Sequence, residues 1–314
     1  MATSRLTLRL GINQPRTTSL VAVVLAGAVI VTGCATSAGG SGGPAPTVLK
    51  VVTTTTVFAD IVRNIGGART DVTSIIPPGV GPEDYEPKPN DTRILDGADL
   101  VVSNGVGLDD FLEKLLASST GGRAARLVLG DGIPTISVGG EPNPHFWLDP
   151  SLVVKYYIPS IVAKLSGLDP SGATSFAANA KTYGDSLTAL DAELQSQAQS
   201  IPADHRKLVT FHDAFPYFAR HFGFELVGVI LANPGQEPSA GEMAQLVETV
   251  KKAGVHAVFT EAQFNPSLAK TLADEAGITE VVTSLYNDAL GPAPADTYVG
   301  VMRWDMQHIV EALR

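Results

Sequence analysis

The middle of the chain, residues 170–199, reads PSGATSFAANAKTYGDSLTALDAELQSQAQ and contains no proline after Pro170. Its apolar residues recur close to the spacing of one helix face, at Phe176, Tyr183, Leu187, Leu190 and Leu194. A helix of about 28 residues would be roughly 42 Å long, because each residue adds 1.5 Å. That length suits a strut between two lobes. A helix lying along the surface of one domain would give the same pattern, so both interpretations stay open.

Strand-like and helix-like segments alternate on both sides of this stretch, which is typical of α/β proteins with parallel sheets. Residues 48–314 are too many for one small core and indicate two lobes. We therefore expect an α/β fold with two lobes, each a parallel-type sheet flanked by helices, joined by one long linking helix. The predicted boundaries are 48–168 for the N-terminal lobe, 169–205 for the linking helix and 206–314 for the C-terminal lobe.

Helix signals refine this outline in three places. Ser239 and Glu242 have the spacing of a capping box and predict a helix that ends at Ala253. Asp296 is expected to cap a final helix over 297–313, and Pro159 to break a helix over 151–165.

The chain begins with features of an export signal. Residues 1–18 contain three arginines and no acidic residue, and the segment 19–32 is almost wholly apolar and small. This apolar run is shorter than the roughly 20 residues of a membrane-spanning helix. The sequence Val31-Thr32-Gly33-Cys34 resembles a bacterial lipobox, which implies removal of the signal peptide 1–33 and attachment of a lipid to Cys34. An ordinary secretory signal with an incidental cysteine is the alternative.

The segment that follows, 34–47, is rich in Gly, Ser, Ala and Pro and should act as a flexible tether. Without residues 1–33 the chain has 19 basic and 32 acidic residues, a net charge of −13. This balance disfavours nucleic acid, whose phosphates require basic patches. Cys34 is the only cysteine, so neither an intrachain disulfide nor a thiolate metal cluster can form.

Four residues of metal-ligating types follow four strand-like segments. Glu83 comes after 73–77, His145 after 133–138, His212 after 207–211 and Asp288 after 280–285. In open α/β sheets, ligands bind beyond the carboxyl ends of the strands. Imidazole and carboxylate groups are suitable ligands for a transition metal when no thiolate is present. The sequence therefore predicts one metal site that both halves of the chain build together.

Each of these residues also has a plain structural interpretation. His145 could be an ordinary surface or hydrogen-bonded histidine, although it lies in the proline-flanked run NPHFWLDP, residues 143–150. His212 could cap the following helix, Asp288 could form an Asx turn, and two other acids lie next to Glu83. Glu261 ends another strand-like segment and could support a ligating histidine through its carboxylate.

Several motifs in order resemble those of the zinc/manganese-type substrate-binding lipoproteins of bacterial ABC metal importers, periplasmic solute-binding protein family 9. The resemblance covers residues 50–314 and rests on the segments 82–91, 98–105, 143–150, 211–218, 259–261, 291–298 and 302–303. It implies two lobes joined by the long helix and a binding site at His145, His212 and Asp288. The family's first ligand is normally a histidine, but here Glu83 stands at that position.

The resemblance implies an extracytoplasmic, lipid-anchored, monomeric binding protein, not an enzyme, that carries a divalent transition metal to an ABC permease. The ion is Zn²⁺ or Mn²⁺, with iron a further candidate. Glu83 could ligate directly, as we expect, could be replaced by water, or could weaken the site. One rival function is a surface adhesion or scaffold lipoprotein with a weak or structural metal site. Another is a metal-dependent hydrolase with Glu261 or Asp213 as its base.

Overall fold

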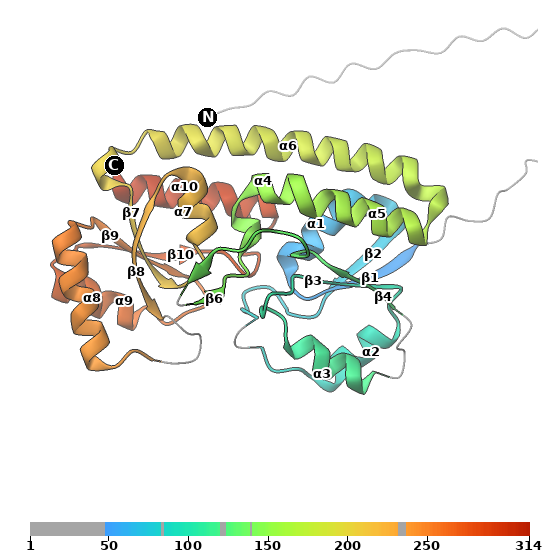
Figure 1. Ribbon diagram of the computed structural model, residues 1–314, viewed down its shortest axis with the longest axis horizontal. Helices are drawn as coiled ribbons and strands as arrows, with labels where there is room; N and C mark the ends of the chain where they lie inside the picture. Colours follow the sequence, from blue (N-terminus) through green and yellow to red (C-terminus); the bar gives the residue numbers. More distant parts are fainter. Residues whose placement is uncertain (1–47, 83–84, 120–123, 139, 232–236) are drawn as a thin grey trace, which may run out of the picture. The chain divides into compact units, whose positions relative to one another are not determined.

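The computed structural model describes residues 48–82, 85–119, 124–138, 140–231 and 237–314 (Figure 1). The described residues form one compact unit. The predicted signal peptide, Cys34 and Glu83 lie outside the described residues. Among the described residues, no helix is both long and apolar enough to cross a membrane.

The N-terminal lobe is built on a parallel four-stranded sheet with the order β2-β1-β3-β4. Its strands are β1 (Leu49–Thr53), β2 (Thr70–Ser74), β3 (Leu100–Ser103) and β4 (Ala125–Val128). Successive side chains of a strand point to opposite faces. Val51 accordingly joins the core under α1 (Thr56–Gly66) and α5 (Ile158–Leu168), while Val52 joins the core under α2 (Pro89–Asp96) and α3 (Phe111–Ser118). Both faces of the sheet are therefore buried.

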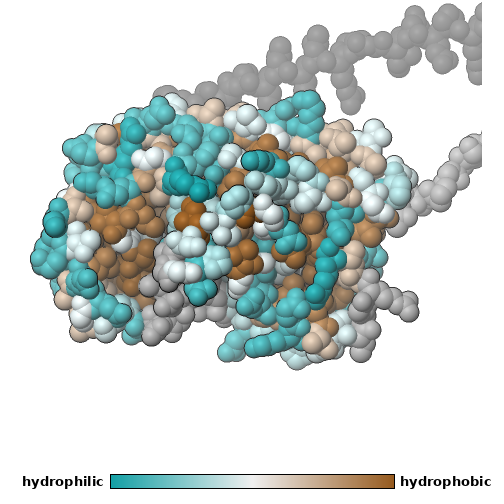
Figure 2. Space-filling view, in the orientation of Figure 1, coloured by the Kyte–Doolittle hydropathy of each residue, from teal (hydrophilic) through white to brown (hydrophobic). Residues whose placement is uncertain are grey.

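The C-terminal lobe repeats the pattern with two parallel strand pairs. These are β7 (Lys207–His212) with β8 (Glu225–Leu231), and β9 (Ala257–Glu261) with β10 (Glu280–Leu285); β7 also lies alongside β9. The helices of this lobe are α7 (Pro216–Phe222), α8 (Ala240–Ala253), α9 (Ser267–Ala276) and α10 (Tyr298–Leu313). Partly exposed apolar residues of β8 contribute to the brown area on the left of Figure 2.

The linking helix is α6 (Ala173–Gln199), preceded by a 3₁₀ turn at Pro170–Gly172. It packs against α1 and α5 of the N-terminal lobe and against α7 and α10 of the C-terminal lobe, as Figure 1 shows along the top of the molecule. Its buried residues form one stripe: Phe176, Ala180, Tyr183, Leu187, Leu190, Leu194 and Ala198. The prediction of two parallel-sheet lobes joined by a long helix is confirmed, and the helix contacts both lobes along its length.

Between the lobes the chain passes through short elements. A two-residue antiparallel pair, β5 (Ser137–Val138) and β6 (Glu141–Pro142), leads into the 3₁₀ turn Phe146–Leu148 and the short helix α4 (Pro150–Leu152). Next come a π-helical turn, Val153–Tyr157, and α5. Pro159 is the second residue of α5 and comes directly after the π-helical turn, and the helical run continues through it. The predicted helix break at Pro159 is therefore wrong.

Two helix caps test the predicted helix starts. Ser239 and Glu242 form the expected capping box, with Ser239 N donating to Glu242 and Glu242 N donating to Ser239 Oγ. The cap of α10 is Thr297, whose hydroxyl accepts from Gly300 N, so the assignment of that cap to Asp296 is wrong by one residue.

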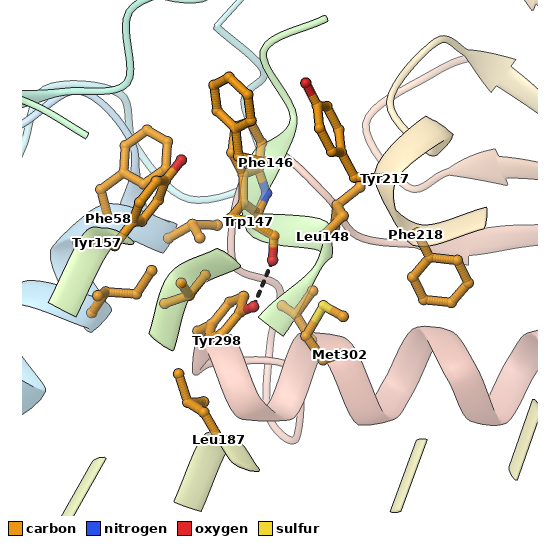
Figure 3. Packing of buried hydrophobic residues seen from close by; sticks show 14 of the residues in the cluster. Phe58, Phe146, Trp147, Leu148, Tyr157, Leu187, Tyr217, Phe218, Tyr298 and Met302 are labelled. Atoms are coloured by element: carbon orange, nitrogen blue, oxygen red, sulfur yellow. Dashed lines mark hydrogen bonds between the residues drawn. The ribbon is translucent and has the colours of Figure 1, made fainter. Parts of the chain in front are cut away.

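One apolar core runs through both lobes and the linking helix. Figure 3 shows its central part, which includes Phe58 of α1, Trp147 of the connecting turn, Met302 of α10 and Leu187 of α6. Tyr298 donates a hydrogen bond from its hydroxyl to the Trp147 carbonyl inside this core. The turn that follows β6 is consequently fixed to both lobes.

Candidate metal centre

The structure brings His145, His212 and Asp288 together in a buried cluster, with one potential ligand atom of each within 4.8 Å of the others. His145 comes just after β6, His212 is the last residue of β7, and Asp288 lies three residues beyond β10. The parallel strands β7 and β10 both point their carboxyl ends at this place, as the sequence predicted. Glu83 is outside the described residues, and its position is not part of this geometry.

His145 is held by the turn that contains it. Asn143 Oδ1 accepts from the backbone N of His145 at 3.1 Å and lies 3.1 Å from His145 Nδ1. The Asn143 amide in turn donates to Asp213, which follows His212 in sequence. Because Nδ1 faces Asn143, the other ring nitrogen, Nε2, faces Asp288 Oδ1 at 3.5 Å.

A second asparagine fixes the same turn from the N-terminal lobe. Asn104 Nδ2 donates to the Pro144 carbonyl at 2.9 Å, and Tyr157 donates its hydroxyl hydrogen to Asn104 Oδ1. Tyr217 of α7 donates to the Asn143 carbonyl at 2.9 Å and accepts from Ile136 N at 2.9 Å. The orientation of His145 thus depends on buried bonds to both lobes.

His212 has a carboxylate behind it. Its Nδ1 is 2.8 Å from Glu261 Oε1, at the end of the neighbouring strand β9, and its Nε2 faces Asp288 Oδ2 at 3.5 Å. Glu261 is buried like His212. A carboxylate on one ring nitrogen orients the ring and makes the opposite nitrogen a stronger electron donor.

The loop that carries Asp288 is fixed by its neighbours. Trp147 Nε1 donates to the Asn287 carbonyl at 2.8 Å, and Asp305 Oδ1 of α10 accepts from Tyr286 N at 2.9 Å. Gln263 Nε2 lies 3.4 Å from Asp288 Oδ2. The Trp147 contact links this loop directly to the turn of His145, so two segments that carry candidate ligands constrain each other.

Burial changes the acid–base behaviour of two carboxyl groups close to the cluster. Burial raises the pKa of Asp213, partly offset by the nearby His145, the Asn143 hydrogen bond and His212. Burial likewise raises the pKa of Asp305 well above its usual range, and the neighbouring charge of Glu261 raises that pKa further. Burial therefore favours the neutral form of the Asp305 carboxyl group, which accepts from Tyr286 N.

The geometry of the cluster fits a transition metal ion. Ligand atoms at about 2.1 Å from a tetrahedral ion lie about 3.4 Å apart, close to the 3.5 Å between each histidine nitrogen and its Asp288 oxygen. The 4.8 Å limit on the cluster leaves room for an ion at its centre. Two imidazoles and a carboxylate make a mixed nitrogen and oxygen donor set, which zinc, manganese and iron(II) can all use.

Sequence reasoning missed three residues that shape this centre. Trp147, Asn287 and Asp305 each bond to a segment that carries a candidate ligand. Asn287 could have been noticed because it precedes Asp288. Asp305 lies in the middle of a helix, 17 positions after Asp288, and no local pattern distinguishes it from a surface acid.

Comparisons with known proteins agree with this picture. Residues 51–312 match the family model of the zinc-uptake complex component A, periplasmic. The chain is 32% identical over 299 residues to the manganese-binding lipoprotein MntA of Halalkalibacterium halodurans, covering 93% of this chain and 97% of that protein. It is 32% identical over 273 residues to the zinc-binding protein TroA of Treponema pallidum, covering 84% and 88%.

Solved structures show the same fold. The periplasmic zinc-binding protein TroA superimposes with a TM-score of 0.78 at 31% identity, covering 84% of this chain and 99% of that chain. A manganese-bound S38A mutant of a periplasmic metal-binding protein from Candidatus Liberibacter asiaticus gives a TM-score of 0.78 at 26% identity, covering 85% and 100%. These findings confirm the resemblance and the two-lobe fold, and this chain belongs to the family of periplasmic zinc-uptake component A proteins.

Proposed function

We propose that this protein captures a divalent transition metal ion, zinc or manganese, between its two lobes and delivers it to the permease of an ABC importer. The observation that carries the proposal is the buried convergence of His145, His212 and Asp288 from both lobes at distances that suit one ion. Membership of a family of metal-uptake components supports a role in transport rather than catalysis. Relatives named as manganese-, zinc- and iron-binding proteins support the same class of cargo.

We further propose Glu83 as the fourth ligand. A site of two imidazoles and two carboxylates is harder than one with three imidazoles, and harder donors favour manganese relative to zinc. Zinc still binds more tightly than manganese at most sites, so the ratio of the two affinities is the quantity to measure. Replacing Glu83 by histidine should therefore raise the ratio of zinc to manganese affinity, measured by competition in the same buffer. An unchanged ratio would place Glu83 outside the set of ligands.

The proposal extends to the location of the protein. Export with cleavage before Cys34, and a lipid on that cysteine, would hold a monomeric body outside the membrane on the tether 34–47. Several relatives are named as lipoproteins, which supports this arrangement. The lobe boundaries proposed above, 48–168 and 206–314 around the linking segment 169–205, describe that body.

Capture should involve little movement between the lobes. Apart from the candidate ligands, hydrogen bonds already join them, from Trp147 to the Asn287 carbonyl and from Leu290 N to Thr56 Oγ1. Tyr298 N also donates to Asp60 Oδ2 at 3.0 Å. Breaking several buried bonds at once is costly, so ion entry by small changes in loops and side chains is favoured over wide opening.

The test is metal analysis and competitive titration of purified residues 35–314 with zinc, manganese and iron(II). We expect one tightly held ion per chain that a chelator removes reversibly. Weak or absent binding would overturn the importer function and favour a surface adhesion or scaffold lipoprotein.

A further inference from the structure

Asn287, the residue before Asp288, reaches across to His212 at the end of β7. It is completely buried. Its side-chain nitrogen, Nδ2, lies 3.2 Å from His212 Nε2 and 3.2 Å from Glu261 Oε1. The nitrogen contacted is therefore the one that faces Asp288 and would bind the ion.

The orientation of this amide is fixed by its other end. Asn287 Oδ1 accepts from the backbone N of Asp288 at 2.7 Å, and Gln263 Nε2 donates to it at 3.3 Å. Rotating the amide by half a turn would point its NH₂ group at the Asp288 N–H and its oxygen at the Glu261 carboxylate. Both contacts would be repulsive, so the NH₂ group faces His212 and Glu261.

The protonation of His212 follows from the carboxylate beside it. Nδ1 lies 2.8 Å from Glu261 Oε1, and a carboxylate beside a ring nitrogen favours the tautomer that carries the proton on that nitrogen. Nε2 then presents its lone pair, and the Asn287 N–H donates to that lone pair. A zinc ion at about 2.0–2.1 Å from a histidine nitrogen uses the same lone pair. One lone pair cannot serve the amide and the ion together.

We propose that Asn287 is a displaceable cap on the ligand nitrogen of His212. The amide bonds to Nε2 when the site is empty, has to release it when the ion enters, and returns when the ion leaves. Competition of this kind lowers affinity and speeds release, both useful in a protein that must hand over its cargo. The inference rests on the proposed role of His212 as a ligand.

The other asparagine of the centre provides the contrast. Asn143 contacts His145 through Nδ1, the nitrogen turned away from Asp288, and leaves Nε2 directed at the site. Asn143 therefore supports a ligand, whereas Asn287 competes for one. Removing the two amides should change metal affinity in opposite directions, which general damage to the site would not do.

The experiment compares Asn287→Ser with the matched variant Asn143→Ser. A serine at 287 is too short to reach the imidazole, but its hydroxyl can still accept from the nearby backbone. Zinc affinity is measured by competition with a chromophoric chelator, and release by stopped-flow transfer to excess chelator. We expect Asn287→Ser to bind about 2- to 10-fold more tightly, the range covered by one neutral hydrogen bond, with slower release. Asn143→Ser should bind more weakly.

A second measurement needs no metal. In the nitrogen NMR spectrum of the metal-free protein, Asn287→Ser should shift the His212 Nε2 resonance towards that of an unprotonated imidazole nitrogen without a donor, while the His145 resonances stay in place. Unchanged or weaker zinc binding by Asn287→Ser, or an unmoved Nε2 resonance, would overturn the cap. If the wild-type protein binds no ion, the proposed function fails, and the NMR comparison still decides whether Asn287 contacts Nε2.

Discussion

The two histidines of the centre are supported by different groups. His145 lies on a proline-flanked turn and has the neutral amide of Asn143 behind it. His212 ends a buried strand and has the carboxylate of Glu261 at its Nδ1 and the Asn287 amide at its Nε2. A carboxylate partner strengthens a histidine ligand more than an amide does. In the proposed site, the C-terminal half would therefore combine the stronger donor with a competitor for it, and the N-terminal half would supply a ligand held mainly by position.

Loss of either histidine should have the largest effect. Even outer partners of ligating histidines contribute 10- to 100-fold to metal affinity, so His145→Ala or His212→Ala should weaken zinc binding by more than about 100-fold. The fold should survive, because the apolar side chains of the core stay in place in both variants. Chelator competition gives the affinity, and thermal unfolding of the metal-free proteins is the control. Wild-type affinity in either variant would remove that histidine from the site.

The carboxylate behind His212 provides the next test. Glu261→Gln keeps the shape of the side chain but removes its charge, and we expect zinc affinity to fall by about 10- to 100-fold. Asn143→Asp is the matched change in the other half, since it gives His145 a carboxylate partner at the same place, although it also places a charge beside Asp213. If Glu261→Gln bound zinc as tightly as wild type, the carboxylate partner of His212 would contribute nothing to zinc affinity.

Replacing Asp305, which packs behind the C-terminal half of the centre, should change metal affinity least of these substitutions. Its pKa is raised well above 3.8 by burial, so the folded protein holds a proton that the unfolded chain releases above about pH 4. The free energy of unfolding contributed by this group therefore decreases as pH rises above that point. Asp305→Asn retains an acceptor for Tyr286 N and does not titrate, so it should gain stability relative to wild type as pH increases from 4 to 7. Urea unfolding across this range measures the difference, and a constant or reversed difference would show that Asp305 is charged in the folded protein.

Much of the fold could be predicted because it depends on local patterns. The stripe from Phe176 to Leu194 identified the linking helix, and the alternation of segments identified two parallel sheets. The caps were less certain, since Thr297 and Asp296 are adjacent residues of suitable types. The helix continues through Pro159 after a π-helical turn, and the spacing of side chains in the sequence does not predict such a turn.

The convergence of His145, His212 and Asp288 was predicted from strand ends, where topology brings distant residues together. The residues that tune the centre could not be found in this way. The bonds of Asn287 to His212 and of Trp147 to the Asn287 carbonyl join segments 75 and 140 positions apart. Such contacts follow from the packing of the two lobes, which the sequence pattern does not specify residue by residue.

X-ray absorption spectroscopy of the zinc-loaded protein is the sharpest test of the proposed metal centre, because it counts the imidazoles around the ion. We expect two imidazole ligands with oxygen ligands beside them, and one imidazole fewer when His212→Ala is loaded at high zinc. A spectrum without imidazole ligands, or one that His212→Ala leaves unchanged, would contradict a metal centre built by His145, His212 and Asp288.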